Sequence, residues 1–104
     1  MLQKFLGLFL CAIIAATFPT ASAASSLDAV GRTLFESTTL GKSGRSCSTC
    51  HPGGRGLEQV DDFTDDELKD IINACIRDAL HGSKLAENAE ELRALVAYVR
   101  SLKR

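Results

Sequence analysis

Three segments of the chain carry apolar residues at the three- and four-residue spacing of an amphipathic helix. They span residues 27–37, residues 64 to about 80 or 81, and residues 88–103. A glycine-rich segment, residues 41–44, leads into residues 47–51, and residues 52–56 after them are too flexible for regular structure. No segment shows the alternation of apolar and polar residues that is typical of a half-buried strand. The pattern therefore predicts a small all-α domain.

Capping residues mark the ends of the second and third segments. Thr64-Asp65-Asp66-Glu67 has the sequence of a capping box, with acids at the positive end of the helix. Gly82 is placed as the C′ residue that ends this helix. Asn88, with Glu91 three residues later, predicts a second capping box, and Lys103-Arg104 suits the negative end of the last helix.

Residues 1–23 have the parts of a secretory signal peptide. Lys4 gives the start a positive charge, residues 5–18 are almost wholly apolar, and Ala21-Ser22-Ala23 matches a cleavage site. The apolar run is shorter than the about 20 residues that span a bilayer, so a retained membrane anchor is the weaker interpretation. We expect cleavage after Ala23 and export of residues 24–104 as one domain, to the periplasm or an equivalent compartment.

Cleavage changes both the charge and the cysteine count. Loss of Lys4 makes the net charge one unit more negative than the −1 of the full chain, and no basic stripe remains. A nucleic-acid partner is therefore not expected. Of the four cysteines, Cys11 leaves with the leader, and Cys47, Cys50 and Cys75 remain. An odd number is unusual in an oxidising compartment, where cysteines are normally paired.

The run Cys47-Ser48-Thr49-Cys50-His51 has the C-x-x-C-H spacing of a c-type haem attachment site. Two thiols on one turn can each add to a vinyl group at the same porphyrin edge. We therefore predict one covalent haem c on Cys47 and Cys50, with His51 as the proximal iron ligand. Its other ring nitrogen should donate to a backbone carbonyl, in the loop that begins at Pro52. A covalent haem also supplies apolar surface that so short a domain needs.

Two other interpretations of the motif involve no haem. Cys47, Cys50, Cys75 and His51 could hold zinc, because thiolate and imidazole suit that ion. Cys47 and Cys50 could instead form a redox dithiol, although no βαβ pattern surrounds them. Export and the adjacent histidine favour haem.

The sixth iron ligand is not the methionine that is common in electron-transfer cytochromes, because Met1 is the only methionine and leaves with the leader. Cys75 and His81 are the leading candidates. Weaker candidates are an open site, Asn73, Lys84 and Asn88. At about 100° per residue, Cys75 lies in the middle of an apolar stripe with Leu68, Ile72 and Ala79.

His81 lies on the opposite face, so a regular helix packed on haem would direct Cys75 to the iron and His81 to water. The alternatives are a small buried cysteine and a surface histidine at a helix C-terminus.

Two segments resemble the terminal helices of class I cytochromes c. They are Val30-Gly31-Arg32-Thr33-Leu34-Phe35 and Ala97-Tyr98-Val99-Arg100-Ser101-Leu102. The resemblance implies helices wrapped around a covalent haem, with Gly31 and an aromatic residue packed against the last helix at Tyr98.

Residues 72–102 are similar to the haem domains of thiosulfate dehydrogenases and of the cytochrome subunits of the periplasmic sulfur-oxidising complex. In those families the cysteine that matches Cys75 is a haem axial ligand. This chain has one C-x-x-C-H motif, whereas those enzymes usually have two haems or a partner subunit, so turnover of thiosulfate does not follow from the resemblance.

These features predict a monohaem c-type cytochrome, not itself an enzyme, that passes electrons between protein partners in sulfur-compound oxidation. One alternative is a catalytic or substrate-binding haem subunit of a thiosulfate-oxidising enzyme, in which Cys75 carries sulfur. Another is a haem-based sensor that uses His81 as a weak ligand. Arg55 could pair with a haem propionate or be a solvated charge. Helix-start charges or a docking face for a basic partner would explain Asp61, Asp62, Asp65 and Asp66.

Overall fold

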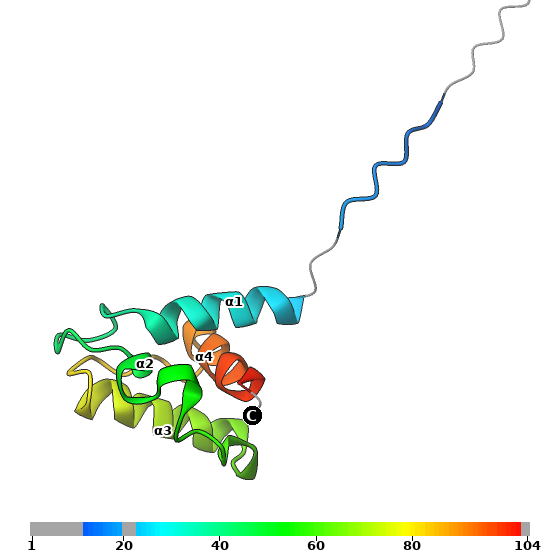
Figure 1. Ribbon diagram of the computed structural model, residues 1–104. Helices are drawn as coiled ribbons and strands as arrows, with labels where there is room; N and C mark the ends of the chain where they lie inside the picture. Colours follow the sequence, from blue (N-terminus) through cyan, green and yellow to red (C-terminus); the bar gives the residue numbers. More distant parts are fainter. Residues whose placement is uncertain (1–11, 20–22, 103–104) are drawn as a thin grey trace, which may run out of the picture.

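The computed structural model describes residues 12–19 and 23–102. Its elements in chain order are α1 (Ala23–Glu36), α2 (Cys47–Cys50), η1 (Pro52–Gly54), η2 (Val60–Asp62), α3 (Asp65–Asp78) and α4 (Glu90–Ser101), where η marks a short 3-10 helix. The described residues contain no strand. The predicted all-α class is confirmed, and α4 lies between α1 and α3 while α2 lies on the near side of the bundle (Figure 1).

The crossing of α1 and α4 is held by a glycine and an aromatic pair. A Cβ atom added at Gly31 would overlap the carbonyl of Ala94 and lie 2.6 Å from the Cβ of Tyr98. One turn further along α1, the ring of Phe35 meets the ring of Tyr98 edge to face, with centroids 5.2 Å apart. The close approach expected at Gly31 and Tyr98 is confirmed.

The hydrophobic core is small and lies where α4 meets its two neighbours. Leu92 and Ile76 are fully buried, and Leu95 is 1% exposed. The other buried apolar residues are Phe35, Leu68, Leu80, Ala94, Val96 and Val99. One face of α3 therefore packs in the core, and the other apolar residues of α3 lie on a different face of the helix.

One of the two predicted capping boxes forms. Thr64 Oγ1 accepts from the backbone N–H of Glu67 at 3.3 Å, and Glu67 Oε2 accepts from the backbone N–H of Thr64 at 2.8 Å. The box predicted at Asn88 is wrong, because α4 begins at Glu90 and its N-cap, Ala89, has no side-chain cap. The N–H of Ala89 instead bonds to the carbonyl of Ala86 at 2.9 Å, which leaves Asn88 in a turn before the helix.

The end of α3 also differs from the expectation. The helix ends at Asp78, and the residue in the left-handed region is His81, with φ of 57°, rather than Gly82. Gly82 is needed for a different reason, because an added Cβ would overlap the carbonyl of Leu40 and lie 3.0 Å from Ile76. The N–H of Gly82 donates to the carbonyl of Ile76 at 2.8 Å, so this turn joins the end of α3 to the loop before α2.

Residues 12–19, which belong to the predicted leader, form no helix and extend away from the domain (Figure 1). The side chains of Ile13, Ile14 and Phe18 are 83–89% exposed. The leader residues 1–11 and 20–22, with Met1, Cys11 and most of the cleavage pattern, lie outside the described residues, as do Lys103 and Arg104. Within the described ranges, no helix is long and apolar enough to cross a membrane.

The α1–α4 crossing makes a prediction about stability. Gly31→Val should lower the free energy of unfolding by about 3 kcal/mol, because an overpacked contact against backbone forces the helices apart. Urea denaturation of the secreted protein measures this change. Thr33→Val, at an exposed position of the same helix, should change stability by less than about 0.5 kcal/mol. Equal effects of the two substitutions would contradict the account of this crossing.

Candidate haem site

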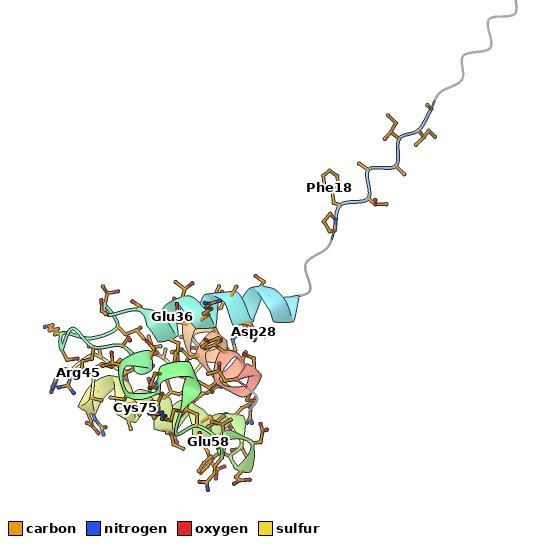
Figure 2. All side chains as sticks on the ribbon, in the orientation of Figure 1. Phe18, Asp28, Glu36, Arg45, Glu58 and Cys75 are labelled. Atoms are coloured by element: carbon orange, nitrogen blue, oxygen red, sulfur yellow. The ribbon has the colours of Figure 1, made fainter. Side chains whose placement is uncertain are left out.

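A cavity of about 350 Å³ lies between α2, α3, α4 and the segment that joins α2 to α3. This volume falls within the range of small-molecule sites. Its walls are mostly apolar, and the residues from α3 and α4 that line it are Leu68, Ile71, Ile72, Cys75, Leu95 and Val99. Figure 2 shows the side chain of Cys75 at the centre of the domain, beside α2. The predicted motif opens onto the same cavity through Cys47, Cys50 and His51.

Helix α2 is a single turn whose first residues are held by hydroxyl groups. The backbone N–H of Ser46 donates to Thr49 Oγ1 at 3.0 Å, and Ser46 Oγ lies 2.7 Å from Ser48 Oγ. The N–H of His51 closes the turn on the carbonyl of Cys47 at 3.0 Å. Ser48 and Thr49, the two residues between the cysteines, thus hold the turn in place, and both thiols lie on its cavity side.

The ring of His51 is oriented by the main chain. Its Nδ1 lies 2.8 Å from the carbonyl oxygen of Arg55, and because a carbonyl can only accept, Nδ1 carries the proton. In the neutral ring Nε2 then keeps its lone pair, and it has no hydrogen-bond partner among the described residues. The contact predicted for His51 with the following loop is confirmed.

Glycines make the loop around His51 tight enough for this bond. The N–H of Gly54 donates to the carbonyl of His51 at 2.8 Å, and Gly53 has a φ of 59°. Gly56 has a φ of 87°, and a Cβ there would lie 3.2 Å from His51 Nδ1. This segment, expected to be irregular, instead includes η1. The side chain of Arg55 is exposed, and its carbonyl group is the part of the residue that contacts His51.

Cys75 faces the motif across the cavity, as the helical wheel predicted. It is exposed to this open space, so the alternative of a small buried cysteine is wrong. Although the residue as a whole is exposed, partial burial of its thiol raises the pKa of Cys75, and the Asp78 carboxylate and the Cys50 thiol raise it further. Burial also raises the pKa of Cys47, with a contribution from Cys75. Cys47, Cys50 and Cys75 all line this cavity.

Of the candidate sixth ligands, all of which lie in the described part of the chain, Cys75 alone lines the cavity. His81, Lys84 and Asn88 are exposed and lie outside its lining. Asn73 is 9% exposed, and its amide is committed to the backbone of Leu85. Asn73 Nδ2 donates to the Leu85 carbonyl at 3.0 Å, and the Leu85 N–H donates to Asn73 Oδ1 at 2.8 Å.

Sequence reasoning missed the wall formed by residues 56–63. Leu57, Val60 and Phe63 line the cavity from this segment, which includes η2. Their spacing of three residues is the period of a 3-10 helix, and this signal was present in the sequence. The backbone of the segment follows that period, since Val60 N–H donates to the Leu57 carbonyl and Phe63 N–H to the Val60 carbonyl, each at 3.3 Å.

The described residues contain no group of three or more His, Cys, Asp and Glu side chains that could hold a metal ion. A haem iron needs no such cluster, because the porphyrin supplies its equatorial ligands. A scan against protein-family models, a search of curated proteins and a search of solved structures each found no match to this chain.

The hydrogen bonds of Asn73 predict a specific loss of stability. Asn73→Ala should cost about 2–3 kcal/mol, because it leaves the N–H and carbonyl of Leu85 without their buried partners. Asn88→Ala, at an exposed position, is the matched control and should change stability by less than about 0.5 kcal/mol. Chemical denaturation of both variants checks the difference. A neutral Asn73→Ala would show that the loop after α3 is held by other contacts.

Proposed function

We propose that this chain is an exported, periplasmic monohaem c-type cytochrome that passes electrons between protein partners. The observation that supports it best is the convergence of one imidazole and two thiols on a single apolar cavity. His51 presents an unpaired Nε2 and is oriented through Nδ1, while Cys47 and Cys50 line the same cavity from one turn. These residues fit haem c in number, chemistry and spacing.

Each of these side chains has a defined role in the proposal. Cys47 and Cys50 hold the cofactor through thioether bonds, and His51 is the proximal ligand. The carbonyl of Arg55 keeps the His51 ring in its tautomer and raises its basicity. When bound, haem c supplies a one-electron redox couple at its iron. The apolar walls from α3 and α4 exclude water and so tune that couple.

Cys75 is the distal ligand in this proposal. Its side chain lines the same cavity as the motif, from α3, whereas His81 lies on a turn outside the cavity. A thiolate ligand adds a negative charge and favours the ferric state, so the potential should be lower than with methionine. The resemblance of residues 72–102 to haem domains of sulfur-oxidising enzymes supports a role in sulfur-compound oxidation.

The resemblance of residues 72–102 to haem domains of sulfur-oxidising enzymes also supports a second candidate. It is a substrate-binding haem subunit of a thiosulfate-oxidising enzyme, in which Cys75 carries sulfur. An assay of the haem-loaded protein with thiosulfate and an electron acceptor distinguishes this alternative from a simple electron carrier.

Haem attachment is the first test. Expression in a host that matures c-type cytochromes should yield a secreted protein with one covalent haem, seen by intact mass and by the haem absorption spectrum. Cys47→Ser combined with Cys50→Ser should abolish covalent attachment. Ser48→Ala, between the two cysteines, should retain it. A wild-type protein without added mass would refute the proposal.

The distal ligand is tested by electron paramagnetic resonance of the oxidised protein. We expect a low-spin signal of histidine and thiolate ligation that Cys75→Ser changes and His81→Gln leaves unchanged. The opposite result, a bis-histidine signal that depends on His81, would exclude Cys75. Binding of carbon monoxide to the reduced protein separately tests the sensor alternative, because two strong axial ligands leave no vacant position.

A further inference from the structure

Arg100, near the end of α4, binds residues 60–65, which comprise η2, the link to α3 and the first residue of α3, through several acceptors. Its Nη2 donates to the carbonyl of Phe63 at 2.7 Å, and its Nη1 donates to the carbonyl of Val60 at 3.3 Å. Its Nε donates to Asp65 Oδ1 at 2.9 Å, and its Nη1 also reaches Asp61 Oδ1 at 3.3 Å. One guanidinium therefore fixes both the main chain and the carboxylates of this segment.

The residues whose carbonyls Arg100 holds are cavity residues. The side chains of Val60 and Phe63 line the cavity, and so does Val99, the neighbour of Arg100 on α4. Phe63 is 40% exposed and Ile71 is 42% exposed, so this wall borders solvent. The contacts of Arg100 at the end of α4 thus determine the position of the partly exposed cavity wall formed by Val60 and Phe63.

We propose that Arg100 is a positioning residue for the haem site. Its guanidinium closes the wall formed by Val60 and Phe63 against α4 and so limits access of water to the bound group. This inference rests on the proposed function. With a thiolate ligand the ferrous core carries the net negative charge and the ferric core is neutral, so lower access of water disfavours the ferrous state and lowers the midpoint potential.

The acceptors require the shape of arginine as well as its charge. Two carbonyls and two carboxylates surround one planar group with five N–H donors, a geometry that the single ammonium of lysine cannot match. The side chain of Arg100 is 28% exposed, whereas the side chains of Asp61 and Asp65 are 74% and 68% exposed, so the carboxylate part of this network is open to water. Lysine would keep the charge near Asp61 and Asp65 but hold fewer of the acceptors.

The test compares three variants of the full, haem-loaded protein: Arg100→Gln, Arg100→Lys and, as a control, Arg93→Gln. Arg93 is an exposed residue of the same helix. Two readouts are needed, the amide hydrogen exchange of residues 57–64 and the midpoint potential. We expect about ten-fold faster exchange in Arg100→Gln, as for local opening without its charge-assisted bonds. Arg100→Lys, which keeps the positive charge, should also speed the exchange and should raise the midpoint potential, and Arg93→Gln should change neither readout.

Wild-type exchange or a wild-type potential in Arg100→Lys would overturn the inference, because a positive charge at position 100 would then be enough to hold the wall in place. If Arg100→Gln does not fold, as judged by far-ultraviolet circular dichroism, Arg100→Lys decides the outcome. Failure of the proposed function is a separate result, since it appears as absence of covalent haem in the wild-type protein. The exchange measurement then still decides whether Arg100 closes this wall.

Discussion

The close crossing of α1 and α4 is the constraint on which the rest of the domain depends. Because Gly31 has no side chain, the backbone of α1 rests against Ala94 and Tyr98 of α4, and the edge-to-face pair of Phe35 and Tyr98 fixes the angle. This crossing takes one side of α4. The other side is left for α3 and for the cavity, to which Leu95 and Val99 contribute.

Helix α3 has to satisfy two environments at once. One face buries Ile76 in the core, and an adjacent face presents Ile72 and Cys75 to the cavity, while buried Leu68 belongs to the core and also lines the cavity. Buried Asn73 does neither and instead bonds to the loop that returns to α4. In the proposed cytochrome, a cofactor with a large apolar surface would complete the packing of the cavity face.

The elements that follow from local chemistry were predictable from the sequence. The helix periodicity, the cap at Thr64, the spacing of the C-x-x-C-H turn and the position of Cys75 on its face all depend on neighbours within a few residues. The cap at Asn88 failed because a turn at Ala86–Ala89 competes for the same backbone. The contacts of Arg100 with residues 35 to 40 positions earlier in the chain depend on tertiary structure, and no local pattern indicates them.

The acceptor for the ring of His51 is a carbonyl of the main chain and not a side chain. Every amino acid at position 55 carries that oxygen, so the orientation of the imidazole is insulated from mutational drift at the residue that supplies it. The orientation of the ring is sensitive to substitution at position 56 instead, because the positive φ of Gly56 and the proximity of the ring leave little room for another residue. Natural variants of this domain should thus be free to change the charge of the loop while its path stays fixed.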